Sequence, residues 1–102
     1  INEIETPFRS SNSTHVYHQY TLKLRGINRN DFKDYLEKKG VPSMVYYPVP
    51  LHLQKAYFQP EFGRGSFPVT EKLSETVISL PIHTEMSLEQ LEFIVTTIKG
   101  YL

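Results

Sequence analysis

The sequence predicts an α+β fold in which helices cover one face of a small sheet. Three observations support this class. Three stretches have the pattern of strands, others carry helix caps or an apolar stripe, and the two kinds of element interleave along the chain. With 102 residues, the chain is long enough for a single hydrophobic core. We therefore expect residues 1–102 to form one domain.

The N-terminal residues predict an irregular lead-in, residues 1–14, followed by a half-buried strand. Pro7 and a run of serine and asparagine favour turns over regular pairing. From Val16 to Arg25 apolar and polar residues alternate, which is the period of a strand with one buried face. His18 falls on the apolar side, and we expect a core histidine there rather than a ligand.

A helix with signals at both ends is predicted next. Asn28 or Asn30 can cap its N-terminus, and Gly40 supplies the left-handed residue that ends it. Pro42 prevents continuation, and residues 43–47 are expected to form a short second strand. The buried stripe of this helix should be Phe32, Tyr35 and Leu36.

The second half of the chain begins with a long loop over residues 48–69, which contains four prolines and two glycines. Loops longer than ~12–15 residues are often functional. A short helix over residues 70–73 and a third strand over residues 77–80 are expected after it. The last helix starts at a capping box of Ser87 and Gln90. Its apolar stripe should be Leu91, Ile94, Val95, Ile98 and Leu102.

Composition disfavours several classes of protein. Eleven basic and eleven acidic residues cancel, whereas nucleic-acid and membrane-surface modules need a clustered basic face, so we expect neither partner. The absence of cysteine removes disulfides and thiolate zinc sites and suits a reducing cytoplasm, where we expect the protein to act. No signal peptide is visible in these residues, and no apolar stretch approaches the ~20 residues of a membrane span. The chain begins at Ile1, which suggests a domain of a longer protein.

Two short motifs have both a functional and a structural interpretation. His15 and His18 are three residues apart, which sends them to opposite faces of a strand, so no metal site is expected. Residues 63–66 could offer backbone amides to a phosphate, but they do not join a strand to a helix directly. A plain turn is therefore favoured at that position.

The run VYYPVPLHLQ, residues 45–54, is unusual in its density of aromatic, proline and polar residues. Strand geometry would send the rings of Tyr46 and Tyr47 to opposite faces. Pro48 and Pro50 should hold the following residues extended, because proline fixes φ. Such a stiff segment at the start of a long loop suits the wall of a pocket, and it suits a structural turn with buried tyrosines equally well.

Four longer stretches carry a resemblance to a known family. They are HVYHQYTLKL, the helix end EKKG, VPSMVYYPVPLHLQKAY and FPVTEKLSETVISLPIHTEMSLEQ. Together these stretches resemble the C-terminal domain of the DegT/DnrJ/StrS aminotransferases, from about His15 to the end of the chain. The resemblance implies the small domain of a fold-type I enzyme, with a mostly antiparallel sheet covered on one face by helices.

The family's activity is implied only through this resemblance. Its members are homodimers that use pyridoxal phosphate to move an amino group, usually from glutamate, to a keto-sugar on a nucleoside diphosphate. Such reactions serve the biosynthesis of amino sugars and surface polysaccharides. The Schiff-base lysine and the groups that hold the cofactor belong to a large N-terminal domain outside residues 1–102. We therefore expect no catalytic residue and no cofactor-binding residue in this chain, and no activity from it alone.

The resemblance also assigns three substrate-binding residues. Many members carry His-Tyr-Pro where this chain has Tyr46, Tyr47 and Pro48, so Tyr47 is expected to contact the sugar nucleotide. Tyr46 stands at the histidine position and can donate a hydrogen bond but not act as a base near neutral pH. His52 matches the histidine of the Pro-Leu-His segment and is expected to position the substrate, or to be structural. The alternatives are a family dehydratase, a non-catalytic regulator, or an unrelated interaction domain.

Overall fold

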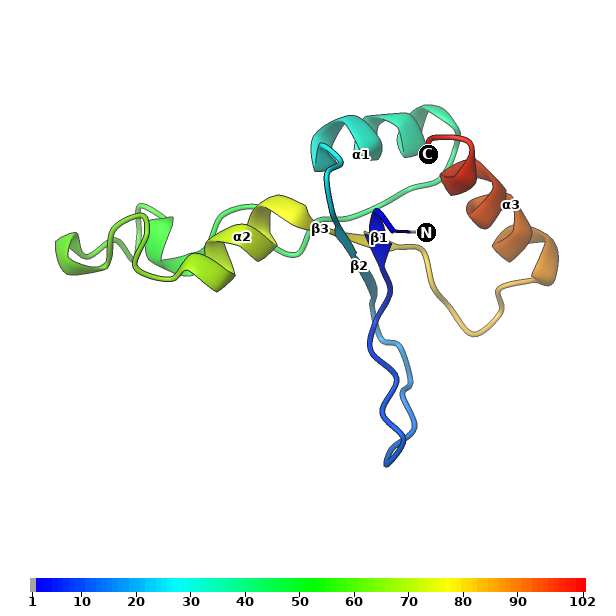
Figure 1. Ribbon diagram of the computed structural model, residues 1–102, viewed down its shortest axis with the longest axis horizontal. Coiled ribbons are helices and arrows are strands. Elements are labelled where there is room, and N and C mark those ends of the chain that lie inside the picture. The colour runs from blue at the N-terminus through cyan, green and yellow to red at the C-terminus, as the bar shows by residue number, and fades with distance from the viewer. Residues whose placement is uncertain (1) are drawn as a thin grey trace.

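The structure is a computed structural model that describes residues 2–102, and at its centre lies a three-stranded antiparallel sheet. The strands are β1 (Ile4–Glu5), β2 (Tyr20–Leu24) and β3 (Val77–Leu80), in the order β1-β2-β3. Helices α1 (Arg29–Lys38) and α3 (Leu88–Lys99) share one hydrophobic core with the sheet (Figure 1). The predicted α+β fold, with an antiparallel sheet and helices packed on it, is confirmed.

The register of β2 and β3 separates the two faces of the sheet. Leu22 lies opposite Ile78, and both are buried in the core. One residue along, Thr21 lies opposite Ser79 on the other face, where their hydroxyl oxygens are 2.8 Å apart. The core consists of Leu22, Leu24, Phe32, Leu36, Val41, Ile78, Ile94 and Ile98.

The N-terminal prediction was partly wrong. Instead of a wholly irregular lead-in, Ile4 and Glu5 form β1. Glu5 makes ion pairs with Lys23 on β2 at 2.8 Å and with Arg25, the residue after β2. The expected strand over residues 16–25 is limited to β2. Residues 6–19, here called the arm, project away from the sheet (Figure 1), where no core exists to bury an apolar face. His18 is accordingly exposed and is not a core histidine.

The first helix follows its predicted signals. The side chain of Asn28 accepts hydrogen bonds from the backbone amides of Asn30 and Asp31, and Gly40 has φ +81°. Phe32 and Leu36 are fully buried, as expected. Tyr35 is only half-buried, because its hydroxyl reaches α3 and donates to the carbonyl of Thr97 at 3.2 Å.

The last helix is also capped as predicted, but only part of its apolar stripe is buried. Ser87 and Gln90 form a complete capping box. Ile94 and Ile98 are buried, whereas Leu91, Val95 and Leu102 are exposed, against expectation. The reason is that only one narrow side of α3 faces the core, and Val95 borders an open hollow next to the sheet instead of being covered.

Residues 45–76, here called the extension, leave the body on the side opposite α3 (Figure 1). The long loop contains two short 3₁₀ helices, η1 (Leu51–Leu53) and η2 (Pro60–Phe62). Helix α2 (Pro68–Thr76) is longer than the predicted 70–73, because Pro68 starts it two residues earlier and it continues three residues past Leu73. The strand expected over residues 43–47 is absent except for one bridge, in which Met44 pairs with Ser79.

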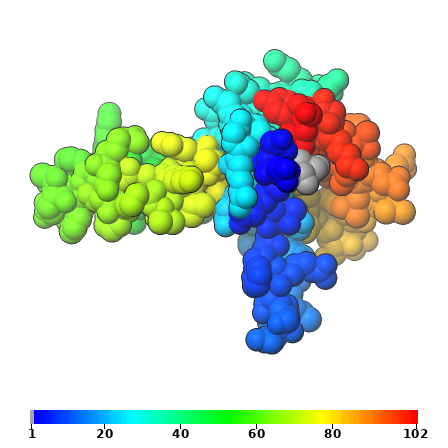
Figure 2. Space-filling view, viewed as in Figure 1, coloured from blue at the N-terminus to red at the C-terminus, as the bar shows by residue number. Residues whose placement is uncertain are grey.

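The base of the extension is tied to α1. The guanidinium of Arg29 donates to the carbonyls of Ser74 at 3.0 Å and Val77 at 3.2 Å, where α2 ends and β3 begins. In the space-filling view the extension and the arm protrude separately from the body (Figure 2). The fold therefore holds two projecting segments on one small core.

Candidate functional site

A groove of about 490 Å³ runs between the run that the sequence singled out and helix α2. We call residues 46–54 the wall segment and this hollow the α2 groove. The wall segment forms one side of the groove, and residues of α2 with the first residue of β3 form the other. The side chains that line it are Tyr46, Tyr47, Val49, Pro50, Leu51, Gln54, Thr70, Leu73, Ser74 and Val77.

The two tyrosines of the wall segment lie together in this groove. Their ring centroids are 5.8 Å apart, and the ring planes make an angle of 73°. The expectation that the rings lie on opposite faces of a strand is therefore wrong. Only Met44 pairs with the sheet, so the alternation of a strand does not extend to Tyr46 and Tyr47, whose peptide bond is cis. Tyr47 is the more accessible ring, at 72% exposed against 38% for Tyr46.

The wall segment is held in shape from within. Pro50 has the extended conformation, with φ −55° and ψ 145°, and the 3₁₀ helix η1 follows it directly. The side-chain amide of Gln54 donates to the carbonyl of Val49 at 3.1 Å and closes this turn. The expectation that the residues after Pro50 stay extended is wrong, because Leu51–Leu53 turn into η1.

His52 lies apart from the two tyrosines. Its Nε2 is 3.0 Å from a carboxylate oxygen of Glu71, and both side chains are about nine-tenths buried. The ring of Phe67 meets the imidazole edge to face, with centroids 4.8 Å apart. His52 therefore faces α2 and a second hollow of about 630 Å³, which the aromatic residues Tyr57, Phe58, Phe62 and Phe67 also line.

Glu71 is the residue of this site that the sequence did not reveal. Besides His52, its carboxylate accepts from the backbone amide of Gly65 at 2.8 and 3.0 Å and from that of Phe67 at 3.3 Å. Burial works to raise the pKa of Glu71, but the hydrogen bonds from His52, Gly65 and Phe67 hold it below its ordinary value. A local signal was available, because Pro68 at a helix start with an acidic residue in the first turn is a typical N-terminus.

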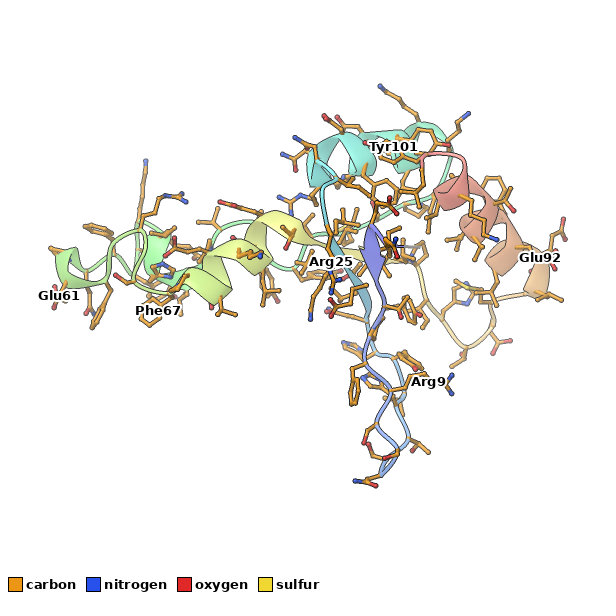
Figure 3. The ribbon with its side chains drawn as sticks, in the orientation of Figure 1. Arg9, Arg25, Glu61, Phe67, Glu92 and Tyr101 are labelled. Carbon is orange, nitrogen blue, oxygen red and sulfur yellow. The ribbon has the colours of Figure 1, made fainter. Side chains whose placement is uncertain are left out.

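The predicted turn at residues 63–66 is confirmed. The amide of Ser66 donates to the carbonyl of Gly63 at 3.1 Å, and Gly65 has φ +94°, which favours glycine. The backbone amide of Gly65, which could have bound a phosphate, instead donates a hydrogen bond to the carboxylate of Glu71. Figure 3 shows Phe67 at the start of α2 and Glu61 near the tip of the extension.

Charged side chains are scarce in the α2 groove. None of the seven lysines lines it, and none of them is buried. Within residues 2–102, no three His, Cys, Asp or Glu side chains come together in a way that could hold a metal ion. Nor does any helix in that range have the length and apolar character needed to cross a bilayer. The groove is thus a surface with hydroxyl and amide donors rather than a centre of ionised catalytic groups.

Comparisons with known proteins agree on one family. The family model of the DegT/DnrJ/EryC1/StrS aminotransferases matches residues 1–99. A Geobacillus stearothermophilus protein named pleiotropic regulatory protein is 36% identical over 98 residues, which are 96% of this chain and 26% of that protein. The dTDP-3-amino-3,6-dideoxy-alpha-D-galactopyranose transaminase of Aneurinibacillus thermoaerophilus is 34% identical, with the same two shares.

A solved structure supports the same relationship. DesV of S. venezuelae, solved in complex with a ketimine intermediate, superposes with a TM-score of 0.85 at 27% identity. The match covers 97% of this chain and 26% of that chain, so the chain spans about a quarter of the length of the relatives that it matches. The chain belongs to the DegT/DnrJ/EryC1/StrS aminotransferase family.

Proposed function

We propose that residues 1–102 are the C-terminal small domain of a pyridoxal-phosphate-dependent aminotransferase. The complete enzyme would move an amino group from glutamate to a keto-sugar on a nucleoside diphosphate, for amino-sugar or surface-polysaccharide biosynthesis, as a cytoplasmic homodimer. The observation that carries the proposal is that Tyr46 and Tyr47 line one groove in a chain of this family.

The tyrosines suit the recognition of a phosphorylated sugar. A phenol donates a hydrogen bond to a phosphate or sugar oxygen, and the ring offers an apolar surface to the sugar. Tyr47 is 72% exposed, so its hydroxyl can reach a ligand without a large movement of the chain. The turn closed by Gln54 and Val49 keeps this wall in one conformation, which lowers the entropic cost of binding.

The residues of this chain do not fit a cofactor-holding role. A Schiff-base lysine is activated by a desolvated pocket or by neighbouring charges, and none of the seven lysines is buried or lies in the α2 groove. Pyridoxal phosphate, when bound, supplies an electron sink for the transfer of the amino group. In our proposal it is held by other parts of the complete protein. Tyr46 and Tyr47 would bind and orient the sugar nucleotide, and His52, which packs against Glu71, would support the segment that carries them.

A regulatory role without turnover is the second candidate. It is favoured by one relative, the Geobacillus stearothermophilus protein whose name describes a pleiotropic regulator. A family dehydratase would share this domain equally well, because the chemistry would differ in residues outside it. Membership of the family removes the third alternative, an unrelated interaction domain.

The decisive experiment uses the complete protein that carries this domain, reconstituted with pyridoxal phosphate. Glutamate should convert the cofactor to its aminated form, which absorbance follows. Addition of dTDP- or UDP-linked keto-sugars should then restore the original spectrum and produce an amino sugar, detected by mass spectrometry. Conversion with glutamate but no transfer to any keto-sugar would contradict the proposed substrate class. No conversion with glutamate would favour the dehydratase or the regulator.

A further inference from the structure

The carboxylate of Glu71 joins the wall segment to the residues that lead into α2. His52 comes from the wall segment, Gly65 from the turn at the end of the loop, and Phe67 from the residue that precedes α2. All the contacts are between 2.8 and 3.3 Å. One side chain therefore sets the position of the loop relative to the helix.

A buried carboxylate needs this number of donors. Removing an ionised group from water is costly unless hydrogen bonds replace the lost hydration, and only acceptors are available on an ionised carboxylate. Here one imidazole and two backbone amides supply them. Hydrogen bonds to a charged acceptor are shorter and stronger than neutral ones, so this junction should be the most rigid point of the extension.

The wall segment connects this junction to the two tyrosines. Four residues separate His52 from Tyr47, and two of them are prolines, which restrict rotation of the backbone. The bond from Gln54 to the carbonyl of Val49 closes the same stretch on the other side of His52. Displacement of His52 is therefore transmitted to the tyrosines instead of being absorbed by a flexible linker.

We propose that Glu71 is a positioning residue for the sugar-nucleotide site. It anchors His52, and through the stiff wall segment it sets the orientation of Tyr46 and Tyr47 in the α2 groove. This inference rests on the proposed function of the groove. It assigns to Glu71 no contact with the substrate, and it makes His52 a link between Glu71 and the tyrosines.

The test uses the complete enzyme with three variants of the junction. Glu71→Gln keeps the size of the side chain but replaces one acceptor oxygen by a donor, which must then face the donors around it. His52→Leu removes the donor to Glu71, whereas His52→Gln keeps an amide near the position of Nε2. Glu75→Gln is the matched control, because Glu75 lies four residues further along α2 with a side chain that is 67% exposed.

We expect Glu71→Gln and His52→Leu each to raise KM for the nucleotide sugar by about tenfold, as expected for one lost hydrogen bond to a charged group. The half-reaction with glutamate should change by less than about twofold in both. His52→Gln should have a KM closer to wild type than His52→Leu has. The double variant Glu71→Gln/His52→Leu should have a KM no higher than that of Glu71→Gln alone. The control Glu75→Gln should match wild type. Unchanged KM in Glu71→Gln, or equal loss in both half-reactions together with a lower Tm, would overturn the proposal.

A second measurement is independent of turnover and separates this inference from the proposed function. NMR spectra of the complete protein, labelled selectively at glycine and tyrosine, report on the Gly65 amide and on the rings of Tyr46 and Tyr47. Glu71→Gln should shift the Gly65 amide and both ring signals, and Glu75→Gln should shift none of them. Ring signals that stay in place would overturn the positioning role. A wild-type enzyme that transfers no amino group would overturn the proposed function alone, while shifted rings would still support the anchoring of the wall segment.

Discussion

The ring of Tyr46 meets the ring of Tyr47 edge to face at the α2 groove, with 5.8 Å between their centroids. Two neighbouring residues of an ordinary strand would not share one hollow in this way. The arrangement places two tyrosine side chains along one side of the groove. Tyr47 is the more exposed of the two and packs less against the protein. Substitution of Tyr47 should therefore affect contact with a ligand more than it affects the packing of the domain.

Tyr47→Phe should weaken binding of the nucleotide sugar in the complete enzyme by about ten- to a hundredfold. The substitution keeps the ring and removes one hydrogen bond, and hydrogen bonds to charged groups contribute roughly 1.5–3 kcal/mol. The half-reaction with glutamate should be affected much less, because it does not involve the sugar nucleotide. Stopped-flow absorbance measures the two half-reactions separately.

Tyr57→Phe is the matched control for that experiment. Tyr57 is similarly exposed, at 61%, but it lines the second hollow and not the α2 groove. It should leave both half-reactions near wild type. Equal loss of both half-reactions in Tyr47→Phe, together with a lower Tm, would show that Tyr47 is structural.

Arg29→Met should lower the free energy of unfolding of the chain by about 1–3 kcal/mol. The substitution keeps the aliphatic stem but leaves the carbonyls of Ser74 and Val77 without their donor at the base of the extension. Urea unfolding followed by circular dichroism gives the value. Arg64→Met, which removes a 72% exposed side chain 3.7 Å from Glu75, should cost less than about 1 kcal/mol. Equal losses in the two variants would argue against the bridging role of Arg29.

Glu5→Gln should lower Tm at pH 7 and at low salt, and the difference from wild type should disappear in acid. Hydrogen bonds from Lys23 and Arg25 hold the pKa of Glu5 below its ordinary value of 4.5. Since the folded-state pKa is the lower one, this stabilisation is present above 4.5 and is lost as the pH falls through the folded-state value.

The measurement is thermal unfolding of wild type and Glu5→Gln at a series of pH values, with and without 1 M salt. The pairs are exposed, so high salt should reduce the difference as well. Glu37→Gln is a suitable comparison, because its partner Lys33 is on the same helix at 3.4 Å and joins no second element. A Tm difference that persists at pH 2 would contradict the role of the ionised Glu5.

Ile78→Val should destabilise the chain by about 0.5–1.5 kcal/mol, because it removes one methylene group from a side chain with no exposed surface. The same substitution at Ile82, which is 37% exposed, should change the free energy of unfolding by less than about 0.5 kcal/mol. Denaturant unfolding of the two variants side by side checks this. A small effect at residue 78 would mean that the core is looser than its burial indicates.

Local signals in the sequence predicted the caps of α1 and α3, because a cap depends on residues that are three or four positions apart, but they placed both ends of α2 wrongly. The cap at Asn28 and the capping box at Ser87 are examples. Strand ends depend on distant partners. Ile4 and Glu5 pair with Leu24 and Lys23 of β2, about twenty positions later in the chain. The sequence around Ile4 therefore carried no local signal that could distinguish β1 from a turn.

The candidate site shows the same division. Proline spacing indicated a stiff wall segment, and that segment lines a groove. The pairing of His52 with Glu71 spans 19 residues and a long irregular loop, and no periodicity connects the two positions. The relative placement of Tyr46 and Tyr47 also depended on where pairing with the sheet stops, which is set by contacts with Ser79 far along the chain.

The separation of the extension from the core has a consequence for how this domain can diversify. All eight residues of the buried core lie outside residues 45–76 (Figure 1). Changes in the tip of the extension can therefore alter the shape of the surface while the buried core stays intact. The form of the second hollow and the stability of the core can thus vary largely independently of each other. A library of substitutions confined to residues 55–62 would reshape that hollow and leave the junction at Glu71 and the α2 groove unchanged.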